Sequence, residues 1–301
     1  MTEGYVPAVE LGGSHVTAAA VDLDRAVVVP GTRCRSALSP AADAATLLDT
    51  IAGTARRVDV GPGACWGLAV PGPFDYAAGI ARYQGVGKFG SLKDVPVGDR
   101  LAARLGIDPY RLRFLNDASA FALGARRLSA PGAERLAAFT LGTGVGSAFL
   151  AGAEVVEDGP LVPPEGRADL LTIDGRPLED TVSTRAMTAR YAQRTGRQVD
   201  GLRELTRLSE DGDRVAAETV RSAMTALGTA LAPWLAAFEP DTVVFGGSIT
   251  AAWSLIGPPL TAALDPAGTR PVAVVEDGEA AALVGAALHA AGDRTGPAPR
   301  T

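Results

Sequence analysis

The chain has 301 residues, 47% of them apolar, and its formal net charge is −6 at pH 7. This much apolar sequence can bury a sizeable core, which argues against a disordered chain and predicts two domains or one large α/β unit. The acidic balance argues against nucleic acid as a partner, so we expect the chain to act on a small molecule.

Three short segments rich in Val and Ala open the chain, separated by Gly or Asp/Arg turns, and predict successive strands. Apolar residues at helical spacing then alternate with further apolar strands. This alternation predicts a mixed sheet covered by helices. The expected strands are 5–13, 15–24, 26–36, 64–73 and 111–117, and the expected helices are 39–58, 95–106 and 118–128.

Two segments of the chain resemble each other. AVELGGSHVTAAAV, from residue 8, aligns without a gap with AFTLGTGVGSAFLA, from residue 138. Each segment predicts a strand, a glycine-rich turn and a second strand. We interpret the pair as an internal duplication, in which two related α/β halves face each other across a cleft that binds ligands.

The boundary between the halves is expected near residue 116, where a strand meets a helix. This gives an amino-terminal α/β domain over 1–115 and a carboxy-terminal one over 116–277. A last helix over about 278–292 is expected to pack back on the first half. The segment 293–301 is rich in Pro and Gly and predicts a flexible tail.

The amino-terminal segment MTEGYVPAVEL has neither the basic region nor the long apolar region of a secretion signal. No later run of about eighteen apolar residues is free of charge, Gly or Pro. We therefore expect a cytoplasmic protein with no membrane contact. The two cysteines, Cys34 and Cys65, lack CxxC spacing. They cannot by themselves form a four-cysteine zinc site, so two reduced thiols and no zinc are expected.

Glycine-rich turns end the first strand of each repeated segment, in ELGGSH at 10–15 and LGTGVGS at 141–147. Glycines let backbone N–H groups approach an anion, and neighbouring hydroxyls add donors. The pair of turns could clamp a polyphosphate from two sides, although each turn alone is also typical of an ordinary hairpin. The candidate phosphate-binding residues are Gly12, Gly13, Ser14, Gly142, Thr143 and Gly144.

A third glycine pair follows a Val-rich strand in DTVVFGGSIT, at 241–250. A strand that ends in Gly246 and Gly247 can accept the flat face of a nucleoside. The segment QGVGKF at 84–89 is a much weaker candidate for nucleotide binding. It lacks the GxxxxGK[ST] spacing of a Walker loop and has Phe89 in the position of the hydroxyl.

The segment FLNDASAF places Asn116 and Asp117 between an apolar strand and the start of a helix. Asp117 could be the N-cap of that helix, which is a common structural role. A carboxylate at the end of a buried strand can also accept a proton from a substrate hydroxyl, while the amide beside it holds other hydroxyls. The residues alone leave both readings open.

Nearly the whole chain resembles the ROK family of bacterial sugar kinases, glucokinase-like members of the actin/hexokinase superfamily. Five motifs carry the resemblance in the expected order: the first phosphate motif, a substrate-side loop, the catalytic Asn-Asp motif, the second phosphate motif and the adenosine motif. They correspond to ELGGSHVTAAAVD, LAVPGPFD, FLNDASAFALG, LGTGVGSAFL and VVFGGSIT. The resemblance implies an actin-like ATPase fold, related to ribonuclease H, with two α/β domains and a central cleft.

The resemblance also implies the activity and its residues. Asp117 would be the general base on a sugar hydroxyl, usually the 6-hydroxyl, and Asn116 would hold neighbouring hydroxyls. The γ-phosphate of ATP would lie near the two glycine turns, with its charge neutralised by Mg²⁺ and backbone N–H groups. Gly72 of the substrate-side loop and Glu179 of GRPLEDTVS would contact the sugar. The family also implies a homodimer.

The sequence departs from the family at the first phosphate motif, which normally begins with Asp and here begins with Glu10. The extra methylene keeps the charge but moves it, and Mg²⁺ tolerates poor geometry badly. We expect Glu10 to contact Mg²⁺ through water.

A second departure is the loss of the three-cysteine zinc hairpin and of the GEIGH-like stretch that reads the sugar. PPEGRADLL at 163–171 stands in that place, with Asp169 at the position of the His and Glu165 and Arg167 as rivals. A solvated loop is the alternative interpretation. If Asp169 faces the sugar, its carboxylate favours a cation. Our hypothesis is an amino sugar such as kanosamine, with glucose or a C7-cyclitol as alternatives.

Two other functions compete with catalysis. Sugar-responsive repressors of the family carry a winged-helix domain before the first phosphate motif, and a first strand near Val6 leaves no room for one. The second competitor is a non-catalytic sugar-binding protein, and its only support is Glu10 in place of the Asp of the first phosphate motif. ATP consumption in the presence of sugars separates an enzyme from a binder.

Overall fold

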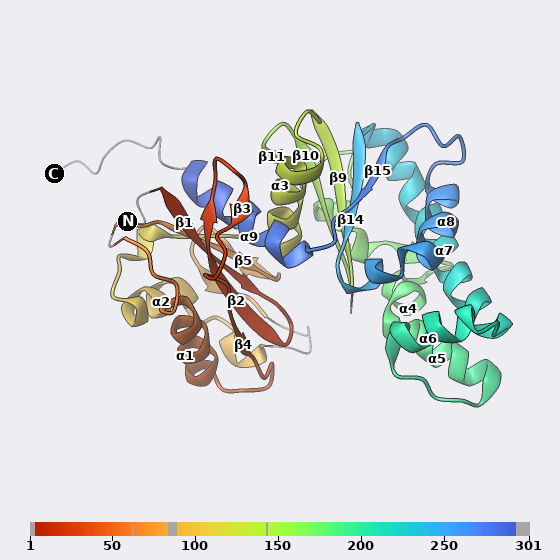
Figure 1. Ribbon diagram of the computed structural model, residues 1–301, viewed down its shortest axis with the longest axis horizontal. Helices are drawn as coiled ribbons and strands as arrows, with labels where there is room; N and C mark the ends of the chain where they lie inside the picture. The colour runs from red at the N-terminus through yellow and green to blue at the C-terminus, as the bar shows by residue number, and fades with distance from the viewer. Residues whose placement is uncertain (1–3, 62, 84–88, 143, 293–301) are drawn as a thin grey trace. The chain divides into compact units, whose positions relative to one another are not determined.

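The computed structural model describes residues 4–61, 63–83, 89–142 and 144–292 (Figure 1). The chain divides into two compact units, which we call unit 1 (Met1–Leu128 and Glu279–Thr301) and unit 2 (Ser129–Gly278). Each unit is a mixed sheet covered by helices. No helix among the described residues has the length and apolar character needed to cross a lipid bilayer.

The sheet of unit 1 has the strand order β3-β2-β1-β5-β8, and β4 also pairs with β2. β1 and β2 form an antiparallel hairpin, while β1, β5 and β8 run parallel to one another. Its strands are β1 (Tyr5–Leu11), β2 (His15–Asp22), β3 (Val27–Val28), β4 (Cys34–Ala37), β5 (Trp66–Val70) and β8 (Leu112–Asn116).

Helices cover both faces of this sheet because alternate strand residues point to opposite sides. Val9 and Leu68 pack with the helices α1 (Ala44–Ala55) and α2 (Val97–Leu105) in one apolar cluster. Ala8 and Ala69 pack in another with α3 (Asp117–Ser129) and α9 (Gly278–Gly292). A small antiparallel ribbon of β6 (Phe74–Asp75) and β7 (Ile80–Ala81) follows β5.

Glycines set how closely α9 packs in unit 1. A Cβ atom on Gly67 of β5 would collide with the backbone of α9 at Ala286. Where α9 crosses α3, a Cβ on Gly124 would collide with Ala281, and one on Gly285 would collide with Ala120. The α9 backbone therefore lies directly against both β5 and α3.

Unit 2 repeats the plan of a hairpin followed by a parallel partner. β9 (Arg135–Leu141) pairs antiparallel with β10 (Val145–Ala151) and parallel with β14 (Thr242–Gly246). The sheet order is β11-β10-β9-β14-β15. Phe139 and Phe245 stack at 5.5 Å in its core. The hairpins that the repeated segments predict are thus present in both units.

The remaining elements of unit 2 are edge strands, a small ribbon and helices that pack on the sheet. They are β11 (Glu154–Val155), β12 (Thr172–Ile173), β13 (Arg176–Pro177), β15 (Val272–Val274), α4 (Glu179–Val182), α5 (Thr184–Thr195), α6 (Gly201–Glu210), α7 (Arg214–Phe238) and α8 (Trp253–Leu264). Short 3-10 turns occur at Gly90–Leu92, Pro109–Arg111, Pro164–Gly166, Ala168–Leu170 and Ser248–Ala252.

The boundary between the units differs from the expected position near residue 116. It lies after Leu128, so that α3 belongs to unit 1. The physical reason is the glycine crossing of α3 with α9, which the local sequence does not reveal. The segment expected to form a tail, 293–301, lies outside the described residues, as do Thr143 and residues 84–88.

Candidate functional site

The polar residues of unit 1 gather at the carboxyl ends of its parallel strands. In the strand register Glu10 of β1 is opposite Ala69 of β5, and Val70 is opposite Asn116 of β8. Gly72 follows β5, and Asp117 follows β8. Ligands of open α/β sheets commonly bind at this edge, which makes it the candidate site of unit 1.

Asn116 caps the amino terminus of α3. Its Oδ1 accepts hydrogen bonds from the N–H groups of Ala118, at 2.9 Å, and Ser119, at 3.2 Å. The Asp117 carboxylate accepts from Ala118 as well, at 2.9 Å. Both side chains therefore accept from the first turn of α3, and Asn116, which accepts from two N–H groups, is the main cap.

Aromatic hydroxyls that the sequence did not single out surround this pair. Asn116 Nδ2 donates to Tyr76 Oη at 3.2 Å, and a Cβ on Gly72 would lie 3.4 Å from the same oxygen. Tyr83 donates to the carbonyl of Pro71 at 3.0 Å. Burial, with the nearby Tyr76 and Asp117, raises the pKa of Tyr83 above its ordinary value. The substrate-side loop thus lies directly beside the Asn-Asp pair.

The β1–β2 turn is held by its backbone. The N–H of Gly12 donates to the carbonyl of His15 at 2.9 Å, and the Ser14 carbonyl accepts from Leu38 at 2.8 Å. A Cβ on Gly12 would lie 2.8 Å from His15 Cε1, whereas one on Gly13 would have no atom within 4 Å. The imidazole of His15 therefore lies over Gly12, whereas Gly13 faces open space.

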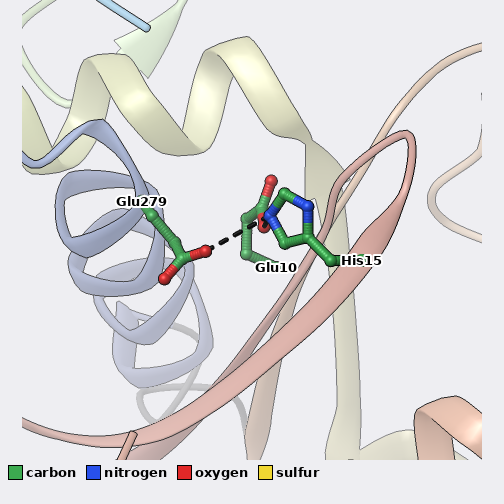
Figure 2. Close-up of side chains that lie close together, drawn as sticks. All are labelled: Glu10, His15 and Glu279. Carbon is green, nitrogen blue, oxygen red and sulfur yellow. Dashed lines mark ion pairs between the residues drawn. The ribbon is translucent and has the colours of Figure 1, made fainter. Parts of the chain in front are cut away.

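His15 lies close to two carboxylates, those of Glu10 and Glu279 (Figure 2). Its Nε2 lies 3.3 Å from Glu279 Oε2 and 3.7 Å from Glu10 Oε2. Glu10 and His15 come from the hairpin, and Glu279 comes from the first turn of α9. Sequence reasoning missed His15 and Glu279, since residues at opposite ends of a chain leave no local pattern.

Charged and polar neighbours surround this cluster. Glu279 accepts a hydrogen bond from Thr17 at 2.8 Å and lies 3.7 Å from guanidinium nitrogens of Arg33 and Arg35. Burial and the positive charge of Arg35 lower the pKa of His15, against the opposing effect of Glu279. Burial and Arg35 thus favour the neutral form of the imidazole.

In unit 2, Glu179 supports the second glycine turn. Its Oε1 accepts from the N–H of Val145 at 3.0 Å, and a Cβ on Gly144 would collide with the Glu179 carboxylate. The N–H of Gly142 donates to the Gly144 carbonyl at 3.0 Å. Glu179, expected as a sugar contact, thus also holds the turn expected to bind phosphate.

The glycine pair after β14 lies beside the same turn. Gly247 has a φ of 96°, and a Cβ there would collide with the backbone of Leu141. A Cβ on Gly142 would lie 3.6 Å from Ser248 Oγ. Gly246 pairs in register with Thr140. The second phosphate motif and the adenosine motif are therefore neighbours within unit 2.

The charges of the 163–171 segment pair mainly with one another. Arg167 donates two hydrogen bonds to Asp169, at 3.2 and 2.7 Å, and one to Glu165 at 3.2 Å. The hydrogen bonds to Asp169 are the main reason why the pKa of Arg167 is raised. The Ser147 hydroxyl of β10 fixes the segment with two hydrogen bonds. It donates to the carbonyl of Gly166 and accepts from the N–H of Ala168.

The candidate residues thus form one group in each unit. Unit 1 brings Glu10, the first turn, Gly72, Asn116 and Asp117 to one sheet edge. Unit 2 brings the second turn, Glu179 and the Gly246–Gly247 pair together. The common cleft expected from the sequence draws on both groups and stays a prediction.

Comparison with known proteins finds a matching family model and a similar enzyme. The model of the ROK family matches residues 174–292. A glucokinase of Thermotoga maritima is 28% identical over 275 residues, which cover 84% of each chain. These matches confirm the predicted resemblance to the ROK family.

Solved structures of ROK proteins share the fold. The ROK hexokinase of Thermus thermophilus is 26% identical, with a TM-score of 0.76 and coverage of 96% of this chain and 98% of that one. A ROK glucokinase of Streptomyces griseus, in complex with glucose and AMPPNP, is 22% identical, with a TM-score of 0.75 and coverage of 94% and 98%. The predicted actin-like ATPase fold is confirmed.

Proposed function

We propose that the chain is an ATP-dependent sugar kinase that transfers the γ-phosphoryl group to a hexose hydroxyl, the 6-hydroxyl being the expected acceptor. The observation that carries this proposal is the Asn116–Asp117 pair at the carboxyl end of β8. Asn116 caps α3 through the N–H groups of Ala118 and Ser119, and the Asp117 carboxylate beside it is the proposed base. The glucokinase and hexokinase relatives support the reaction class.

In the proposed reaction the sugar hydroxyl attacks the γ-phosphorus and gives its proton to Asp117. The new oxygen–phosphorus bond forms as the bond to the leaving ADP breaks. Asn116, Gly72 and Glu179 are the proposed contacts to the other hydroxyls of the sugar. Positioning and electrostatics supply most of the rate, since the Asp117 carboxylate only needs to accept one proton.

Open space at Gly13 supports a phosphate site at the first glycine turn. A Cβ on Gly144 or Gly247 would meet Glu179 or Leu141, so these glycines allow close packing of the second turn. We assign Gly12, Gly13, Ser14, Gly142, Thr143 and Gly144 to the phosphates and Gly246 and Gly247 to the adenosine. Mg²⁺ bound with ATP would neutralise phosphate charge, and Glu10 is the residue proposed to hold its water.

The ion pair between Arg167 and Asp169 affects which sugar we expect as the substrate. An amino sugar such as kanosamine would place its ammonium against Asp169 only by competing with a bidentate guanidinium. Glucose needs no such displacement. We therefore place glucose first and kanosamine second, with a C7-cyclitol as the further alternative.

Steady-state kinetics test this function. ADP release is measured with glucose, glucosamine, kanosamine and a C7-cyclitol, each at saturating MgATP. ADP release that depends on one of these acceptors is expected. Thermal stabilisation by a sugar without ADP release would instead identify a non-catalytic binder. The expected homodimer and cytoplasmic location stay predictions, and light scattering of the purified protein tests the first.

A further inference from the structure

The Glu10, His15 and Glu279 cluster has the geometry of metal ligands. A tetrahedral ion with bonds of about 2.0–2.2 Å holds its ligand atoms roughly 3.3–3.6 Å apart. Nε2 of His15 lies 3.3 Å from Oε2 of Glu279 and 3.7 Å from Oε2 of Glu10. One atom from each residue lies within 4.8 Å of the other two.

The groups behind these ligands also suit a metal. Ser14 Oγ lies 3.5 Å from His15 Nδ1, so the other ring nitrogen has a partner while Nε2 faces the carboxylates. Thr17 donates to Glu279 at 2.8 Å and fixes that carboxylate. Metal-binding histidines and carboxylates are commonly oriented by such outer partners. The side chains are also partly shielded, with 15%, 25% and 18% of Glu10, His15 and Glu279 exposed.

We propose that Glu10, His15 and Glu279 bind a first-row divalent metal ion such as Zn²⁺, Co²⁺ or Mn²⁺. The imidazole ligand distinguishes this ion from the Mg²⁺ of MgATP, because Mg²⁺ prefers oxygen ligands. Three protein ligands leave a coordination position for water or an anion. The ion would tie the first phosphate turn to α9. This site lies within unit 1 and shares Glu10 with the Mg²⁺ contact of the proposed kinase, so its test uses protein without nucleotide.

Two arginines compete with the ion for Glu279. Arg33 and Arg35 each lie 3.7 Å from its carboxylate, Arg35 with 58% of its side chain exposed. Because Arg35 is largely in solvent, it can move away when a cation binds. The competition predicts that removing its charge strengthens metal binding, which a simple ion pair between His15 and Glu279 does not predict.

The test is titration of the metal-free full-length protein with Co²⁺, in the absence of nucleotide and sugar, at pH 7.5. We expect one ion per chain, visible bands in the absorption spectrum and a raised Tm. Millimolar Mg²⁺ should not displace the ion, and Zn²⁺ should. Absence of any Co²⁺ binding, or binding that Mg²⁺ displaces fully, would overturn the proposal.

Variants locate the site. H15Q and E279Q should each weaken Co²⁺ binding at least tenfold, and R35Q should strengthen it severalfold. E276Q and R25Q are matched controls, since Glu276 and Arg25 are exposed residues outside the cluster. If H15Q failed to fold, the tighter Co²⁺ binding expected of R35Q would still show whether the ion binds at this cluster. Equal affinity in the wild type, H15Q and R35Q would place the ion elsewhere.

The histidine content of the chain gives a second readout. His15 and His289 are its only histidines, so NMR of the imidazole groups has two sets of signals, and H289Q assigns them. Zn²⁺ should shift the His15 signals in proportion to occupancy and leave those of His289 in place. A shift confined to His289 would contradict the site.

Discussion

Asp117 and Asn116 are adjacent, but the structure gives them different tasks. The D117N variant should lose activity by about 10²–10⁴-fold, the range typical of a general base. Its fold should persist because an Asn side chain can still accept from the Ala118 N–H. Kinetics with glucose and the Tm of the same sample check both expectations. A variant with near wild-type turnover would remove Asp117 from the mechanism.

N116A should behave differently, because it removes the cap of α3 and the contact with Tyr76. Loss of an Asn cap costs about 1 kcal/mol of stability. Denaturant unfolding should show that cost for N116A and little change for D117N. Equal stability of the two variants would show that the cap lies elsewhere.

Glu179 is expected to contact the sugar and also holds the second glycine turn, and variants can separate these two roles. Because it accepts from Val145 in the second phosphate turn, E179A should raise the KM for ATP as well as that for the sugar. E179Q can keep that hydrogen bond and should mainly affect the sugar. The two KM values are measured separately for each variant. A pure sugar contact would leave the KM for ATP unchanged in both.

Arg167 decides whether Asp169 is available to a cation. R167Q would leave the Asp169 carboxylate without its bidentate partner. The ratio of kcat/KM for kanosamine to that for glucose should then rise. An unchanged ratio would indicate that the segment does not read the sugar. R176Q, at an exposed arginine of the β12–β13 ribbon, is the matched control.

At the level of elements, α9 depends on glycine for its close approach. G285A should lower the free energy of unfolding by about 1–3 kcal/mol, as overpacking does, because the new Cβ meets the α3 backbone at Ala120. G53A in α1 is the control, since a Cβ there meets nothing within 4 Å and Ala favours a helix. Denaturant unfolding compares the two, and equal effects would contradict the crossing.

Sequence predicts the parts of this fold that rest on local pattern. The two hairpins follow from apolar strands around glycine turns, and the position of Asn116 follows from a strand that meets a helix. The local sequence does not predict that α3 belongs to unit 1. That depends on small residues in α3 and α9, two helices that are distant in sequence. The position of Glu179 on the phosphate turn and that of Glu279 beside His15 were missed for the same reason. Thr17 and its partner Glu279 are 262 positions apart.

At the scale of the whole molecule, unit 2 is one continuous stretch of chain and unit 1 is built from both ends. Helix α9, the last described element, supplies Ala286 and Leu283 to an apolar cluster on the unit 1 sheet. It also supplies the carboxylate beside the first phosphate turn. Unit 1 therefore lacks part of its core until the end of the chain is in place.

This connectivity sets an order of events on the ribosome. Domains fold as units while the chain is being made. The sheet of unit 2 is complete in sequence before α9 leaves the exit tunnel, whereas the Ala-rich face of the first sheet must wait for it. The Ala-rich face of the unit 1 sheet therefore stays uncovered by α9 throughout the synthesis of unit 2.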